Sequence, residues 1–318
     1  MRAAFVRALV EAGERDERIV LLTGDLGYMA LEPFADRFPD RFFNVGVAEQ
    51  NMVGVATGLA EAGFIPYVYS IATFASLRPY EFIRNGPVLH RLPVRIVGVG
   101  GGVEYGSNGI SHYALEDLAV MRVQPALTVL APADHRQAST LVAQTVGLPG
   151  PIYYRLGKDD VSLVPGLDGR FELGRAELVR QGTDCLMITI GAITVEAVAA
   201  ADLLEAEGVS CAVLVVSSLR PAPETDIADA LLACSTVMTV EAHYTTGGLG
   251  SLVAEIATDR GISCRLRRCG FDDQPDTISG SQGYMQDAAG LSAAALARTA
   301  LQLVAGSNPQ GVSPILPA

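Results

Sequence analysis

The sequence predicts an α/β protein made of two α/β sandwich domains, each with a parallel or mostly parallel sheet. Short β-branched runs alternate with helical stretches along most of the 318 residues, which is the pattern of a parallel sheet covered by helices. The length exceeds the ~100 to 200 residues of a typical domain. A segment rich in Gly, Asp and Pro interrupts the alternation after Lys158, so we expect two domains joined there.

The first domain is expected to span residues 1–158. Residues 1–20 alternate apolar and charged side chains with helical spacing and lack the continuous apolar centre of a signal peptide, which predicts a folded, cytoplasmic start. Six later runs read as strands separated by helices. These runs are IVLLTGD (19–25), FFNVGV (42–47), IPYVYS (65–70), VRIVGVG (94–100), LTVLAPA (127–133) and PIYYRL (151–156).

The second domain is expected to span residues 184–306, after a linker at 159–183. Its strands are predicted at CLMITIG (185–191), VSCAVLVVSS (209–218) and TVMTVEA (236–242), and its last helix at LSAAALARTALQLVAG (291–306). Residues 307–318 are rich in Pro and are predicted to form a loosely ordered tail.

The composition excludes several classes of partner. A net charge of −12 without a basic stretch repels phosphate backbones, so nucleic acid is not expected. The sequence contains no run of about 18 apolar residues, so no membrane span is predicted. The five cysteines form no CxxC pair and are expected to be buried thiols, and the four histidines lack HxxxH or HExxH spacing. The chain therefore shows no metal site of its own.

The most informative stretch is NVGVAEQNMVGVATGLAEAG (44–63), where a strand runs into a helix rich in small residues. Met52, Ala56 and Leu59 follow Glu49 at helical spacing on the same side, so the carboxylate is expected at the end of an apolar stripe and away from water. The alternative is that Glu49 only completes the first turn of the helix.

The segment VAEQNMVGVATGLA (47–60) resembles the glutamate segment of the transketolase family, which deoxyxylulose-phosphate synthases and 2-oxoacid dehydrogenase β subunits share in looser form. The resemblance implies thiamine diphosphate as cofactor. It also implies that Glu49 hydrogen-bonds N1′ of the aminopyrimidine and thereby promotes deprotonation of the thiazolium C2.

Two further segments extend the resemblance. YSIATFASLRPYEFIRN (69–85) is similar to the family segment that packs on the aminopyrimidine, which implies Phe74 as the stacking ring and Arg78 and Tyr80 as wall residues; ordinary helix core is the alternative for Phe74. GSNGISHYALEDLAVMR (106–122) is similar to the segment that carries a His or Gln beside the reacting carbons, which places His112 there. A helix cap or surface position is the alternative for His112.

The sequence also departs from sugar-phosphate transketolases. Gly100 and Asn108 stand where the family has a histidine and an acidic residue, and Lys158 stands where it has a phosphate-binding arginine, with Arg155 just before it. Lysine binds phosphate as a point charge without the arginine fork. We therefore expect His112, Asn108, Arg155 and Lys158 at a substrate site that takes a donor other than an ordinary pentose phosphate.

Two other segments are interpreted as structural. VGVGGGVEYG (97–106) lacks the complete dinucleotide fingerprint and is read as a tight loop that lines a cleft at a strand end. VEAHYTTGGLGS (240–251) is similar to the family's C-terminal domain, where His243 and Glu241 are expected to be structural.

The resemblance implies a missing half of the cofactor site. The family's diphosphate-binding domain, with its GDG motif and downstream Asn, precedes this region, and the TGDLG run around Asp25 has no following Asn at suitable distance. We therefore expect a separate N-terminal subunit that holds the diphosphate and Mg²⁺, in an α2β2 assembly.

Three functions stay open at this stage. The leading one is transfer of a two-carbon ketol unit from a ketose-type donor to an aldehyde or other acceptor. The second is decarboxylation of a 2-oxoacid, as in deoxyxylulose-phosphate synthase or dehydrogenase β subunits. The third is a noncatalytic scaffold subunit that keeps the fold.

Overall fold

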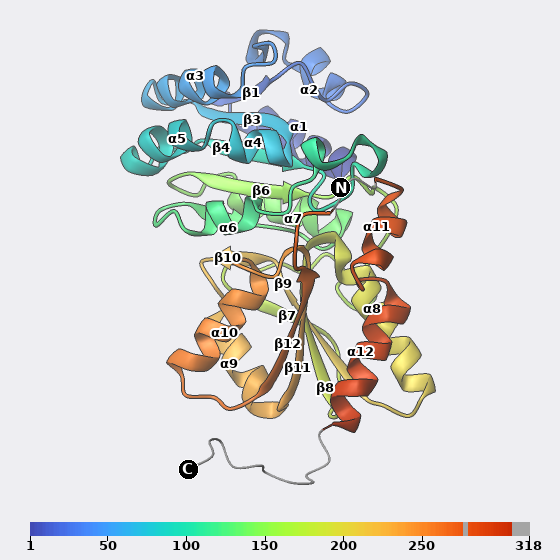
Figure 1. Cartoon of the computed structure of the whole chain (residues 1–318). Helices are drawn as coiled ribbons and strands as arrows, with labels where there is room; N and C mark the ends of the chain where they lie inside the picture. Colours follow the sequence, from blue (N-terminus) through green and yellow to red (C-terminus); the bar gives the residue numbers. More distant parts are fainter. Residues whose placement is uncertain (276–278, 307–318) are drawn as a thin grey trace, which may run out of the picture.

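The computed structural model describes residues 1–275 and 279–306, which form two layered sheets with helices on both faces (Figure 1). The predicted fold class, with two mostly parallel sheets, is confirmed. The predicted tail at 307–318 lies outside the described residues.

The first sheet has seven strands in the order β10-β5-β6-β4-β3-β1-β2. All its pairs are parallel except β10 with β5. The central strands are buried on both faces, which explains their continuous apolar runs. The strands are β1 (Ile19–Thr23), β2 (Phe42–Asn44), β3 (Ile65–Ile71), β4 (Arg95–Val99), β5 (Thr128–Leu130), β6 (Ile152–Leu156) and β10 (Ser218–Arg220).

Helices cover the two faces of this sheet with separate apolar cores. Phe5, Tyr67 and Tyr154 pack together on the face covered by α1 (Arg2–Arg15), α2 (Glu32–Arg37) and α7 (His135–Thr145). The other face is covered by α3 (Glu49–Glu61), α4 (Ala72–Leu77), α5 (Tyr80–Ile83) and α6 (Asp117–Arg122). Short helical turns lie between these elements: η1 (Pro39–Arg41), η2 (Arg84–Val88), η3 (Gly106–Asn108) and η4 (Ile110–His112).

The second sheet has five strands in the order β12-β11-β8-β9-β7. Its strands are β7 (Ala176–Arg180), β8 (Cys185–Ile190), β9 (Cys211–Val216), β11 (Thr236–Tyr244) and β12 (Arg265–Phe271). In Figure 1, α8 (Thr194–Ala206) and α12 (Ala293–Ala305) lie on one side, and α9 (Glu224–Ala233) and α10 (Leu249–Asp259) lie on the other. The turn η5 (Gly191–Ile193) precedes α8, and α11 (Gln282–Ala288) precedes α12.

The structure differs from the predicted organisation in the region between the domains. Residues 176–180, inside the predicted linker, form β7, which pairs antiparallel with β9 and lies at the edge of the second sheet. The predicted strand at 209–218 is divided, since β9 belongs to the second sheet and β10 pairs with β5 of the first. Strand β12 was not predicted because three of its first four residues are arginines, so it lacks the continuous apolar run of a buried strand.

The two domains pack against each other, and the chain also returns from the second domain to add a strand to the first sheet. Strand β10 extends the first sheet with residues that follow β9, pairing Ser218 with Leu130. One apolar cluster extends from Ile96 of the first sheet to Val253 of α10. The two domains are therefore packed as one continuous body (Figure 1).

Within the described part of the chain, one stretch, residues 282–305, is long and apolar enough to cross a membrane by length and composition alone. The structure divides this stretch into α11 and α12, and α12 packs against α8.

Candidate functional site

Glu49 lies at the start of α3, above the ends of β1 and β3. The chain leaves β2 at Asn44 and turns through Gly46, whose φ of +73° is in the left-handed region that favours glycine. The Glu49 side chain is only 1% exposed. Met52 and Ala56 are buried on the same side of the helix, which confirms the predicted apolar stripe.

Two side chains satisfy the buried Glu49 carboxylate. Ser70, at the end of β3, donates its hydroxyl to Oε1 at 3.1 Å. Arg78, just after α4, donates Nη1 to Oε1 at 3.0 Å and to Oε2 at 2.8 Å. Arg78 is 44% exposed, so a buried anion is paired with a cation that reaches water.

Phe74 of α4 lies beside this ion pair and is half-buried. The guanidinium carbon of Arg78 is 3.8 Å from the centre of the Phe74 ring, within the range of a cation–π contact. The His112 ring meets the same Phe74 ring edge-on, with centroids 5.2 Å apart. The structure therefore brings together Glu49, Phe74, Arg78 and His112, residues that the sequence placed in one site.

Tyr105 and Lys158 continue this arrangement on the far side of His112. The Tyr105 and His112 ring centroids are 5.8 Å apart, and the Lys158 ammonium is 4.2 Å from the Tyr105 ring centre. Glu104 accepts a hydrogen bond from the Lys158 backbone, and desolvation raises the pKa of Glu104 to about 7. We call Glu49, Arg78, Phe74, His112, Tyr105 and Lys158 the site cluster.

Arg155 does not belong to the site cluster, and its expected role in substrate binding is wrong. Its guanidinium is buried between the domains, where Nε donates to Asp117 at 2.9 Å. Its Nη2 donates to the carbonyls of Ala114 and Ala242 at 2.9 and 2.8 Å. These contacts use the side chain to join the two domains instead of binding an external anion.

Two other expected site residues point elsewhere or lie at the margin. The Tyr80 hydroxyl donates to the Val120 carbonyl at 2.8 Å and accepts from the Gln124 amide, so it faces the α6 end. Asn108 is exposed in η3, and the neighbouring Gly106 lies against the chain before α11 at Gly280.

The glycine-rich loop contributes residues to the site that were not predicted from the sequence. Gly100 has a φ of +79°, and a Cβ at this position would overlap the Tyr105 ring. Tyr105 therefore fills the space beside Gly100. Glu104 and Tyr105 lie within the loop that was predicted to line a cleft, and that prediction could have identified them as site residues. No feature of the sequence identified Ser70.

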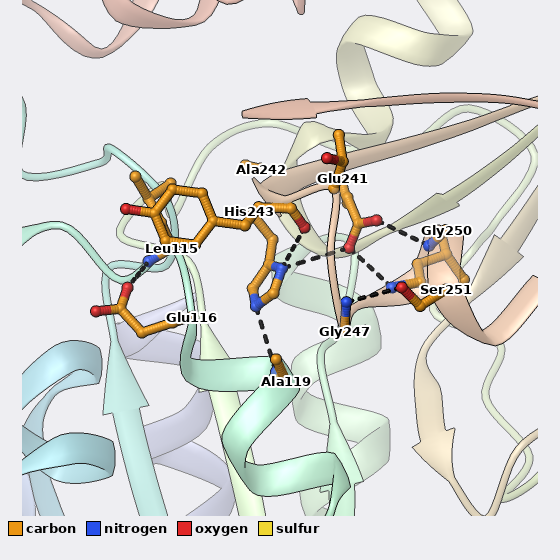
Figure 2. A network of polar contacts seen from close by, with 12 residues as sticks. Leu115, Glu116, Ala119, Glu241, Ala242, His243, Gly247, Gly250 and Ser251 are labelled. Atoms are coloured by element: carbon orange, nitrogen blue, oxygen red, sulfur yellow. Dashed lines mark hydrogen bonds and ion pairs between the residues drawn. The ribbon is translucent and has the colours of Figure 1, made fainter. Parts of the chain in front are cut away.

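Glu241 and His243 form a second polar network, between the domains (Figure 2). Glu241 accepts from the backbone N–H groups of Leu249 and Gly250, both at 2.8 Å, at the start of α10. The Nδ1 of His243 lies 2.7 Å from the Tyr244 carbonyl, and its Nε2 accepts from the Ala119 N–H at 3.3 Å. Burial raises the pKa of Glu241. This network ties β11 and α10 to α6.

Asp25 also has its partners within the chain. Its carboxylate accepts from the Asn44 amide at 2.9 Å and the Tyr28 hydroxyl at 2.8 Å. Over residues 1–275 and 279–306, no group of three His, Cys, Asp or Glu side chains is arranged to hold a metal ion.

Family models decide the relationship of this chain to known proteins. Residues 1–162 match the pyrimidine-binding domain of transketolase, and residues 174–296 match the transketolase C-terminal domain. The chain belongs to the transketolase family. Both expected domain types are thus present, in the expected order.

This transketolase-family chain is similar over nearly its whole length to subunits of split enzymes. It is 33% identical to the 6-deoxy-6-sulfo-D-fructose transketolase subunit SqwH of Clostridium sp. strain MSTE9, covering 97% of this chain and 95% of that protein. A solved split-gene transketolase, described as an inactive beta4 tetramer, superposes with a TM-score of 0.84 at 36% identity, covering 96% of this chain and 97% of the other.

The transketolase-family chain is also related to a longer enzyme. It is 34% identical to the 1-deoxy-D-xylulose-5-phosphate synthase of Heliobacterium modesticaldum, covering 94% of this chain and 46% of that protein. The chain spans about half the length of this relative.

Proposed function

We propose that this chain is the subunit that carries the catalytic glutamate in a transketolase-like transferase, which moves a two-carbon ketol unit from a ketose-type donor to an aldehyde or other acceptor. The observation that carries the proposal is the site cluster: the buried Glu49 carboxylate pairs with Arg78, the Arg78 guanidinium lies over the half-buried Phe74 ring, and His112 meets that ring at its edge. Transketolase-family proteins use thiamine diphosphate.

The residues present fit the aminopyrimidine half of this cofactor, which supplies carbanion stabilisation when it is bound. Glu49 would hold a proton between its carboxyl and N1′ in a site shielded from water. Phe74 would offer its ring for stacking. Ser70, which donates to Oε1, would orient the carboxyl.

A partner subunit would hold the diphosphate and Mg²⁺. The relatives that match this chain along nearly their full length are described as a transketolase subunit and as a split-gene transketolase, which supports a partner for this chain as well. We propose an α2β2 assembly, because the family resemblance implies an active site between subunits. The five free cysteines fit a reducing, cytoplasmic location.

The substrate is proposed to differ from an ordinary pentose phosphate. In this proposal His112, whose ring contacts the Phe74 ring, would be nearest the reacting carbons, and Asn108 and Lys158 would contact the rest of the substrate. Because the Tyr105 ring fills the space beside Gly100, a side chain at position 100 has no room in this loop. Lys158 offers a single positive charge and no arginine fork, so it suits an anionic group without bidentate geometry.

A second candidate is decarboxylation of a 2-oxoacid, favoured by the similarity to 1-deoxy-D-xylulose-5-phosphate synthase. Release of CO₂ from pyruvate by the assembled enzyme would support this reaction. Ketol transfer releases no CO₂ from a ketose donor.

Calorimetric titration of Mg²⁺ and thiamine diphosphate tests the proposal. We expect binding to the chain co-expressed with its N-terminal partner and none to the chain alone, with donor cleavage lost in Glu49→Ala. Absence of binding in both samples would contradict the proposal and favour a scaffold subunit. Ordinary turnover of pentose phosphates by the pair would contradict the proposed substrate class alone.

A further inference from the structure

The Arg78 guanidinium occupies the space between the two groups that the proposed function assigns to the cofactor. Its Nη1 donates to both oxygens of Glu49, at 3.0 and 2.8 Å. Its central carbon lies 3.8 Å from the centre of the Phe74 ring. Arg78 is therefore a flat nitrogen donor that both hydrogen-bonds the carboxylate and covers the aromatic ring.

An aminopyrimidine bound in this place would need the same two contacts. It would hydrogen-bond the Glu49 carboxyl through a ring nitrogen and stack on the Phe74 ring. Guanidinium groups stack on aromatic faces and pair with carboxylates because they are planar and carry several N–H donors. The two groups cannot use the same Glu49 oxygens and the same ring face at once.

We infer that Arg78 is an intramolecular competitor of the cofactor, a latch that closes the aminopyrimidine site of this chain until the cofactor displaces it. This inference rests on the proposed function and changes the expected role of Arg78, from a wall residue beside the cofactor to an occupant of its place. The latch controls access to the aminopyrimidine site and takes no part in the reaction.

The Arg78 guanidinium can leave the Glu49 carboxylate easily. Arg78 is 44% exposed, so its guanidinium can move into water without crossing a packed region. Its backbone lies between α4 and Pro79, outside the helix, and no other side-chain hydrogen bond holds the guanidinium in place among those found in the described residues. Contacts at this exposure each contribute only a few-fold to an equilibrium constant, so the closed form raises the apparent Kd of a competing ligand by about tenfold.

The test uses the aminopyrimidine fragment 4-amino-2-methylpyrimidine, which needs no diphosphate site, and the chain alone. Ligand-observed NMR, which detects weak binding that calorimetry does not register, should give an apparent Kd about tenfold lower for Arg78→Ala than for the wild type. Arg78→Lys, which keeps the charge but loses the flat fork, should fall between them. Arg84→Ala is the matched control, because Arg84 is an exposed arginine six positions along whose guanidinium donates to Asn85.

Three outcomes would overturn the latch. Equal or weaker binding of the fragment by Arg78→Ala would show that Arg78 is not a competitor. No measurable binding by any variant would show that removing Arg78 opens no site. A tighter Kd that persists in the double variant Glu49→Ala/Arg78→Ala would place the fragment elsewhere.

The latch and the proposed function fail separately. If the wild-type pair of subunits cleaves a donor in a Glu49-dependent way and Arg78→Ala leaves the fragment's Kd unchanged, only the latch is wrong. If neither the wild-type pair nor the Arg78→Ala pair binds thiamine diphosphate, the proposed function is wrong.

Discussion

Glu49 and Glu241 are both buried, and their partners differ in kind. Glu241 is held by two backbone N–H groups at the start of α10, and both Glu241 and His243 are fully buried. Glu49 is equally buried, but its partners are the side chains of Ser70 and the half-exposed Arg78. Backbone donors cannot leave without unfolding a helix, whereas a side chain can exchange with a ligand. Burial of a carboxylate therefore marks a candidate site only when its partners can be replaced.

The largest expected effect separates the two glutamates by stability. Glu241→Ala should lower the free energy of unfolding by about 3 kcal/mol, because two buried N–H groups lose their acceptor at ~1 to 3 kcal/mol each. Glu49→Ala should lower it by only about 1 kcal/mol, because the Ser70 hydroxyl alone loses a buried partner and the released Arg78 is solvated. Urea unfolding followed by circular dichroism measures both values, and equal losses would contradict the comparison.

A second prediction concerns Glu104, whose carboxyl is desolvated beside the site cluster. Its folded pKa is raised to about 7 from an ordinary value of 4.5, so its contribution to stability is present below pH 4.5 and is lost as the pH rises through about 7. Between pH 5 and pH 8 the wild type should lose about 2 kcal/mol more than Glu104→Gln.

Thermal and urea unfolding at the two pH values measure this difference. Glu81→Gln serves as the control, since Glu81 is exposed on α5. Identical pH profiles for the wild type and Glu104→Gln would show that Glu104 is not the group responsible.

The smallest expected effect distinguishes His243 from His112. His243→Ala should lower the free energy of unfolding by about 1.5 kcal/mol, because the Ala119 N–H loses a buried acceptor. His112→Ala should change it by less than about 0.5 kcal/mol, since His112 is only half-buried. A stability loss at His112 as large as at His243 would make His112 a structural residue.

The sequence predicted the parts of the fold that follow a regular period. The six strands of the first domain and three of the second were found because buried parallel strands read as continuous apolar runs. Strand β10 was missed because it has three residues and follows β9 after one residue, and β12 because its exposed edge is charged.

The candidate site was predictable residue by residue but not in its contacts. Motif similarity selected Glu49, Phe74 and His112, whereas the pairing of Arg78 with Glu49 joins positions 29 apart and depends on how α3 and α4 meet. The error at Arg155 has the same cause. Its partner Asp117 is 38 positions away and buried, and no local pattern shows that this arginine is already used.

Strand β10 has a consequence for how the protein is made. In the described structure the β5 edge of the first sheet is closed by residues 218–220, which come after β7, β8 and β9 along the chain. During synthesis the first 158 residues therefore emerge with an open strand edge, a surface that pairs readily with other chains. The nascent first domain stays exposed to that hazard until the ribosome has delivered part of the second.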